Sequence, residues 1–86
     1  MTKQQFLDGK SFSLPYTYSD STYRCDKDGK SLIKEYRTKE GKVIISDYLM
    51  NIDKIGSKMI TCFTFILDTK ITKKIRFEDM VEVTSA

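Results

Sequence analysis

The sequence predicts a mainly β protein of the α+β type, in which a short N-terminal helix precedes a five- to six-stranded antiparallel sheet. Two observations lead to this prediction. Segments rich in β-branched and aromatic residues alternate with short polar turns, and Gly29, Gly41 and Gly56 stand in three of those turns. Each of the four glycines is also followed within two residues by a lysine, which brings positive charge to the strand ends. We expect a meander that is strongly bent or closed into a small barrel.

Chain length and charge limit the possible classes of protein. The 86 residues suit a single β-rich domain spanning 1–86. A chain of this size buries only about 60–65% of the surface of its unfolded form, so we expect one modest core. Fifteen basic and twelve acidic residues give a net charge of +3. A strong nucleic-acid binder usually concentrates a larger positive excess on one face.

The first residues predict a helix at about 3–8. Thr2 is a suitable N-cap, and Gln5 stands three residues later, which completes a capping box. Gly9 suits the left-handed position that ends many helices. Because so short a helix is marginal by itself, its apolar side chains must pack against the sheet.

Alternation of apolar and polar residues, together with the turns, predicts the strands. They are expected at about 11–16, 22–26, 32–38, 43–53, 58–67 and 71–77, with a loop at 16–21 between the first two. Pro15 cannot donate to a ladder, so the first strand is expected to be an edge strand or to end there.

The segment 58–67 is the most apolar part of the chain, and it is apolar on both faces. One face carries Met59, Phe63, Phe65 and Leu67, and the other carries Ile60, Cys62 and Ile66. A strand of this kind is usually covered on both sides. The sheet can curl, the helix can pack against it, or a second copy can cover it. We expect a bent sheet with the helix packed against it and some apolar surface left over.

The core is expected to be built from four large side chains of two neighbouring strands. These are Met59, Phe63, Phe65 and Tyr48.

No catalytic set can be assembled from the residue types present. The chain has no histidine, which excludes serine and cysteine nucleophiles activated by histidine. Cys25 and Cys62 lie in predicted strands and suit neither a disulfide in a reducing compartment nor a structural zinc site. Asp26 and Asp28 flank a hairpin turn, where aspartate is favoured for local hydrogen bonds. We therefore expect a protein that is not an enzyme and holds neither cofactor nor metal.

Two kinds of partner fit the remaining signals. Tyrosines and cations in neighbouring strands are typical of proteins that bind single-stranded nucleic acid by base stacking and phosphate attraction. Tyrosine, methionine, phenylalanine and arginine are also enriched in protein interfaces, and an edge strand can accept a partner strand. The candidate interaction residues are Tyr23, Arg24, Tyr36, Arg37, Lys74 and Arg76. Protein binding, to another protein or to a second copy, is our leading hypothesis, and nucleic-acid binding is the alternative.

The N-terminus is polar and lacks the apolar region of a signal peptide, and no apolar run approaches the length of a membrane span. We therefore expect a cytoplasmic location and no membrane partner.

The first twelve residues, with Phe6-Leu7, Gly9 and Phe12, resemble the start of many small uncharacterised proteins of T4-like tailed phages, marine ones especially. The segment 74–80 is similar to endings in the same group, and the likeness covers about a fifth of the chain. The resemblance implies a phage accessory protein that acts inside an infected bacterium by binding a host or phage macromolecule. It carries no catalytic residue.

Overall fold

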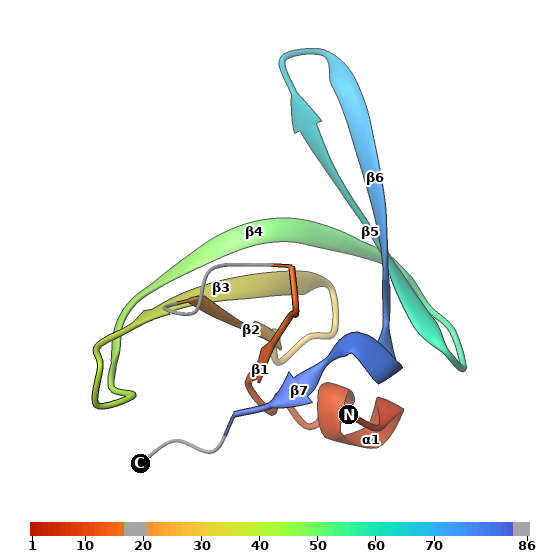
Figure 1. Cartoon of the computed structure of the whole chain (residues 1–86). Helices are drawn as coiled ribbons and strands as arrows, with labels where there is room; N and C mark the ends of the chain where they lie inside the picture. The colour runs from red at the N-terminus through yellow and green to blue at the C-terminus, as the bar shows by residue number, and fades with distance from the viewer. Residues whose placement is uncertain (17–20, 84–86) are drawn as a thin grey trace.

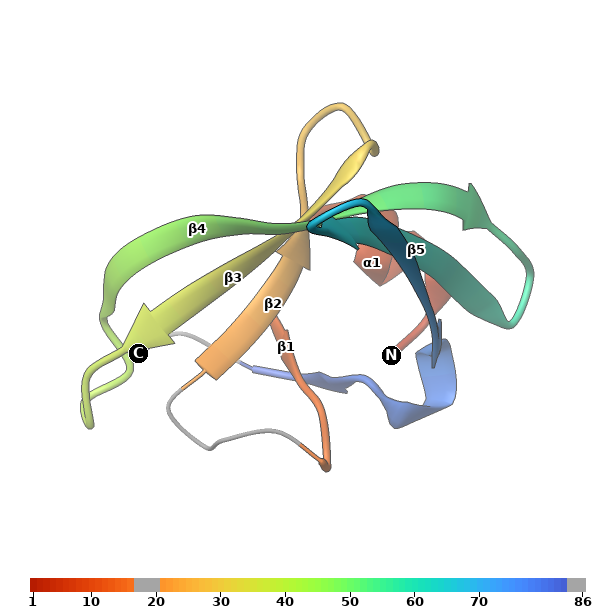
Figure 2. The same ribbon diagram turned by 90° about the horizontal axis from the view of Figure 1, so that it is seen from above.

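The computed structural model describes residues 1–16 and 21–83 and contains one short helix and a seven-stranded antiparallel sheet curled into half a barrel (Figures 1 and 2). The elements are α1 (Lys3–Leu7), β1 (Phe12–Ser13), β2 (Ser21–Cys25), β3 (Ser31–Arg37), β4 (Val43–Ile55), β5 (Met59–Ile66), β6 (Thr69–Arg76), the 3-10 helix η1 (Phe77–Asp79) and β7 (Val81–Glu82). The predicted fold class is confirmed. The sheet has one strand more than expected, because β7 is only two residues long and leaves no periodic pattern. Part of the loop expected between the first two strands, at 17–20, lies outside the described residues.

The helix α1 is capped as its sequence predicts. The backbone N–H of Gln5 donates to the Thr2 hydroxyl at 3.1 Å, and the Thr2 N–H donates to the Gln5 side chain at 2.9 Å. Gly9 follows with a φ of +79°, which suits glycine at a helix end. Phe6 is fully buried against Phe12 and Phe77, with ring centroids 6.0 and 5.7 Å away. These contacts hold the short helix against the concave side of the sheet.

The sheet order is β6-β5-β4-β3-β2-β1-β7, so the two ends of the described chain meet. β1 pairs with β2 on one side and with β7 on the other, which makes it an interior strand. It ends at Ser13, two residues before Pro15, so the proline ends the strand rather than marking an edge. The N-terminal ammonium of Met1 donates to the carbonyl oxygens of Phe77 and Met80, at 3.1 and 2.8 Å. η1 is thereby held beside α1.

The curl of the sheet originates in β4. This strand carries one extra residue opposite β3 at two places, Leu49 and Ile44, and one opposite β5, Asp53. A bulge of this kind bends the strand and increases its twist. Three bulges in one 13-residue strand therefore turn a flat meander into half a barrel (Figure 1).

The core fills the concave side of the curled sheet. Its buried apolar residues are Phe6, Phe12, Leu14, Tyr23, Cys25, Leu32, Met50, Ile60, Cys62, Ile75, Phe77 and Met80. The predicted core is wrong in all four of its members. Met59 and Phe63 are only half-buried, while Phe65 is 59% exposed and Tyr48 54% exposed. Both faces of 58–67 are apolar, and the sheet bends so that the other face, with Ile60 and Cys62, is the one that is buried.

Replacing Ile60 with alanine tests this choice of face, and Ile66 in the same strand is a matched control. Ile60 is fully buried between Ile55 and Ile75, whereas Ile66 lies on the same face but is 61% exposed. We expect Ile60→Ala to lower the free energy of unfolding in urea by about 2–5 kcal/mol. Ile66→Ala should change it by less than about 0.5 kcal/mol. Equal losses in the two variants would contradict the burial pattern.

Candidate interaction surface on the β5–β6 hairpin

The end of the β5–β6 hairpin projects beyond the rest of the sheet. β4 pairs with β5 from Ile60 to Phe63 only, whereas β5 and β6 remain paired with each other as far as Ile66 and Thr69. The part beyond Phe63, residues 64–71, is therefore a two-stranded arm, and Figure 1 shows it standing away from the other strands. A two-stranded ribbon has little hydrophobic packing of its own, so its apolar side chains are left in solvent.

The arm exposes apolar side chains on both faces and at its tip. Leu67 at the tip is 94% exposed, and Phe65, Ile66 and Ile71 are also exposed. Alternation along the strands places Phe65 on the convex side and Ile66 and Ile71 on the concave side. Phe65 meets Phe63 edge to face, with ring centroids 6.0 Å apart and an interplanar angle of 85°. Clusters of exposed apolar side chains mark candidate interaction sites.

The tip residue Leu67 adopts a backbone conformation that disfavours leucine. Leu67 and Asp68 form a two-residue turn between the paired residues Ile66 and Thr69, and the φ of Leu67 is +57°. For a residue with a Cβ atom this region costs about 1–2 kcal/mol, and tight hairpin turns usually place glycine, asparagine or aspartate there. A large apolar side chain thus occupies a strained and fully exposed position. Residues in such conformations cluster at functional sites, which makes the tip a candidate contact point.

The hairpin also carries the net positive charge of the protein. From Met59 to Arg76 it has four basic side chains and one acidic side chain, a net charge of +3. That value equals the net charge of the whole chain, because the other residues contain eleven basic and eleven acidic side chains. Within the arm, the Lys70 ammonium lies 4.6 Å from the centroid of the Phe63 ring. Cations and aromatic rings therefore share the convex face of the hairpin.

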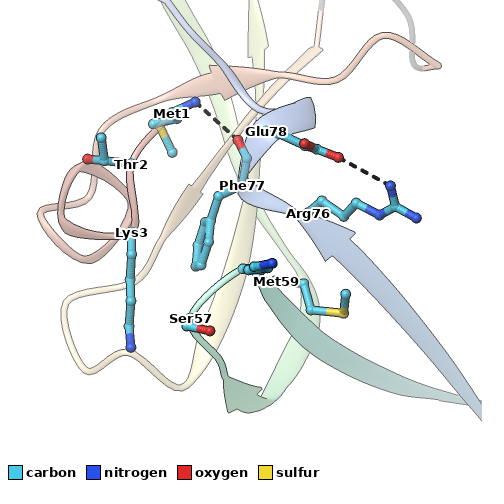
Figure 3. Close-up of a pocket in the computed structure, with 9 residues that line it drawn as sticks. Met1, Thr2, Lys3, Ser57, Met59, Arg76, Phe77 and Glu78 are labelled. Atoms are coloured by element: carbon cyan, nitrogen blue, oxygen red, sulfur yellow. Dashed lines mark hydrogen bonds and ion pairs between the residues drawn. The ribbon is translucent and has the colours of Figure 1, made fainter.

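A cleft of about 610 Å³ opens at the base of the hairpin, as Figure 3 shows. Met1, Met59 and Phe77 supply apolar lining, and three basic residues, Lys3, Lys58 and Arg76, stand around it. Arg76 is paired with Glu78 at 3.2 Å, on the solvent-exposed side of the cleft. Because Met59 pairs with Arg76 at the start of the hairpin, the cleft lies between the base of the hairpin and the N-terminal residues Met1, Thr2 and Lys3.

The predicted interaction residues do not form one surface. Tyr23 is buried, with its ring 5.9 Å from that of Phe12, so it belongs to the core instead of the surface. Arg24 and Arg37 both bind Glu35, at 3.2 and 3.6 Å. The two arginines are thus committed to a buried carboxylate.

The Glu35 cluster is a structural polar network on the side of the sheet away from the core. Glu35 also accepts a hydrogen bond from the Ser11 hydroxyl at 2.9 Å. Arg37 donates to the Thr22 hydroxyl at 2.8 Å and to the Gly41 carbonyl at 2.7 Å, which ties the β3–β4 turn to β2. A buried charge needs partners of this kind to offset the loss of hydration.

The other three predicted residues are divided between two places. Tyr36 is half-buried on β3, where the Lys34 ammonium lies 4.9 Å from its ring centroid. Lys74 and Arg76 are exposed on the convex side of β6. Of the six, only these two lie on the hairpin. The sequence signal for its apolar part is the excess of apolar residues in 58–67, which predicts some uncovered apolar surface although Met59, Phe63 and Phe65 are expected in the core.

The two cysteines belong to the buried core. Both are free thiols and both are buried. Burial raises the pKa of Cys25, and it raises the pKa of Cys62 to about 11. Across 1–16 and 21–83, no group of three or more His, Cys, Asp or Glu side chains could hold a metal ion. In the same residues, no helix combines the length and the apolar character needed to cross a membrane.

Comparison with protein-family models, with curated proteins and with solved structures finds no match to this chain.

The raised pKa of Cys62 predicts that this thiol reacts slowly in the folded protein. The fold favours the protonated thiol, so this contribution to stability is present below the ordinary pKa of 9.0 and is lost as the pH rises through about 11. At pH 8 we expect Cys62 to react with iodoacetamide roughly 100-fold more slowly in the native state than in urea. The pKa of the thiol is about two higher in the native state, so the fraction of reactive thiolate is about 100-fold lower. Mass spectrometry of the Cys62 peptide measures the two rates, and equal rates would contradict the burial of this thiol.

The strain at Leu67 predicts that glycine stabilises the protein. Leu67→Gly relieves the left-handed conformation, and part of that gain is offset by the greater freedom of glycine in the unfolded chain. We expect a net gain of about 0.5–1 kcal/mol in the free energy of unfolding, measured in urea. Leu67→Ala is the control, because it removes the exposed side chain and keeps the strain, and it should leave stability unchanged. Loss of stability in Leu67→Gly would show that the tip is not strained.

Proposed function

We propose that this protein is a non-enzymatic binding module that contacts a partner protein through the arm of its β5–β6 hairpin. The observation that carries the proposal is the arm itself, in which apolar side chains occupy both faces and the tip. In the setting that the phage resemblance implies, the partner is a protein of the infected bacterium or of the phage.

The composition of the arm supports a protein as the partner. Aromatic and long aliphatic side chains gather at the centres of protein interfaces, and charged residues stand at the rim. Phe65 and Leu67 offer large side chains that can enter pockets on another surface, with Lys70 beside them. Such anchors carry most of the binding free energy in typical complexes.

The chemistry of the remaining residues supports a non-enzymatic role. The chain has no histidine. Its two thiols are buried with raised pKa values, and the buried carboxylate of Glu35 is held by two arginines. None of these groups is arranged as a nucleophile beside a general base.

Binding of single-stranded nucleic acid is the second candidate, and it now rests on different residues. Phe63 and Phe65 share the convex face of the hairpin with Lys70, Lys74 and Arg76. Rings on which bases can stack, flanked by cations that attract phosphates, are the elements that single-strand binders use. Binding of a fluorescent oligonucleotide at low salt, with a steep loss of affinity as salt is added, would support this candidate over a protein partner.

Capture of a partner from a bacterial host lysate by the immobilised protein tests the proposal, with two matched double variants. Phe65→Ser/Leu67→Ser removes apolar side chains from the arm. Ile44→Ser/Ile45→Ser removes two exposed apolar side chains from the far end of β4. We expect the arm variant to lose about 90% or more of the captured partner and the β4 variant to retain it, since anchor residues are worth about 1–2 kcal/mol or more each.

Light scattering on the same three proteins identifies self-association. If the partner is a second copy, the wild type and the β4 variant are dimers and the arm variant is a monomer. A monomeric wild type whose captured proteins are unaffected by the arm variant would rule out the proposed function.

A further inference from the structure

We propose that the free edge of β6 accepts an acidic, extended segment of the partner as an additional antiparallel strand. The inference rests on the proposed function and specifies the chemistry of the partner. It follows from the position of β6 in the sheet, the direction of its backbone groups and the sign of its side chains.

β6 is an edge strand of eight residues. It is the outermost strand in the sheet order, and in the described residues its strand partner is β5 alone. The opposite edge, β7, is two residues long and offers too short a ladder. An unpaired edge of the length of β6 presents a row of backbone donors and acceptors to another chain.

The register of the hairpin shows which backbone groups face outward. In a hairpin closed by a two-residue turn, the closing pair exchanges both hydrogen bonds, and every second pair does the same. The closing pair is Ile66 and Thr69, so the odd-numbered residues of β6 face β5. The N–H of Phe77, which donates to the Lys58 carbonyl at 3.0 Å, continues this alternation. The outward groups therefore belong to the even-numbered residues Lys70, Thr72, Lys74 and Arg76.

The side chains at the same positions determine the charge of the partner. Lys70, Lys74 and Arg76 lie on the convex side of β6, where Arg76 also pairs with Glu78, and residues directly opposite each other on paired strands place their side chains on the same face. A strand added at this edge meets these cations most favourably with acidic residues at alternate positions. The concave side differs, because Lys73 lies over the Tyr16 ring at 5.2 Å and Ile75 is buried. Acidic residues are thus favoured on one face of the incoming strand only.

Charge argues against a second copy as the added strand. Antiparallel pairing of two β6 strands places the same three cations of each copy on one face, within reach of the other set. Like charges that stand directly opposite each other destabilise a sheet. An acidic segment avoids this repulsion, and the cleft that Lys3 lines lies beside the end of β6 at Arg76 (Figure 3).

A designed peptide tests the inference without a known partner. The probe is an eight-residue peptide in which Glu alternates with Val or Thr, and two controls accompany it. One control has Lys in place of Glu. The other keeps all the charges but carries N-methyl groups on the Glu amides, which removes the backbone donors that would face β6. The peptide is titrated to about 1 mM, a concentration that half-saturates a site of millimolar affinity. Binding is followed by NMR through the amide resonances of the protein.

We expect the acidic peptide to shift the amides of Lys70, Thr72, Lys74 and Arg76 and to bind more weakly as salt is added. The Lys peptide should not bind. The affinity of the N-methylated peptide should be lower by about tenfold or more, because this peptide loses hydrogen bonds without losing charge.

Protein variants separate backbone pairing from charge. Lys70→Glu/Lys74→Glu should weaken binding of the acidic peptide by about tenfold or more. Lys39→Glu/Lys42→Glu makes the same charge change at the β3–β4 turn and should weaken binding by less than about threefold. Thr72→Pro removes one outward N–H, and edge strands tolerate proline at such positions. Thr72→Pro should weaken binding of the acidic peptide, and Thr72→Ala should not. The unfolding transition of each variant checks that it is folded.

Four results would overturn the inference. The first is the absence of β6 shifts with the acidic peptide, and the second is equal binding of its N-methylated form. The third is dimerisation through β6. The fourth is stronger binding of an oligonucleotide than of the acidic peptide at the same amides. If the arm variant still loses its captured partner while the acidic peptide fails to bind, the proposed function stands and only the strand-pairing inference fails.

Discussion

The shape of this protein depends on the bending of one strand, β4. β4 pairs with β3 on one side and with β5 on the other, and it carries two extra residues opposite β3 and one opposite β5. Each bulge turns the strand further toward the concave side, so the sheet can surround a core built around Phe6, Leu32 and Ile60. A straight β4 would leave a flat meander with no enclosed side. The same bending leads β5 away from β4 after Phe63, and the arm follows from it.

A small chain cannot bury every apolar residue it contains, and the fold distributes the excess unevenly. The concave side takes the aromatic residues of α1, β1, β2 and η1, which arrive from both ends of the chain. The convex side of β5 has no layer to cover it within the described residues. Phe63 and Phe65 therefore pack on each other and on Lys70. Apolar surface is concentrated where the structure is thinnest, which is unfavourable for an isolated domain and useful for a binding module.

Local sequence signals predicted the elements of this fold well, because turns, caps and alternation are short-range effects. The capping box at Thr2 and the glycine turns are examples. The sequence alone did not reveal which face of 58–67 is buried, because both faces are apolar and the choice depends on bulges in another strand. Tyr23 was misplaced for a related reason: a tyrosine in a strand looks the same whether its ring meets solvent or Phe12. The apolar excess in 58–67 predicted exposed apolar surface, but no sequence signal predicted that the end of the hairpin projects beyond the sheet.

The placement of all the net charge in one hairpin has a consequence for the kinetics of association. Outside the β5–β6 hairpin the molecule is neutral overall, and the +3 of the hairpin comes from Lys73, Lys74 and Arg76 at its base, because Lys70 and Asp68 cancel within the arm. This separation polarises the molecule, so the field of an acidic partner would rotate it while the two are still diffusing together. The base of the hairpin would then face the partner in most encounters, with the arm beside it. In the proposed complex, such steering would raise the rate of productive collisions and leave the lifetime of the complex to the apolar contacts at the tip. Speed and persistence of binding would thus be governed by different side chains of the same short element.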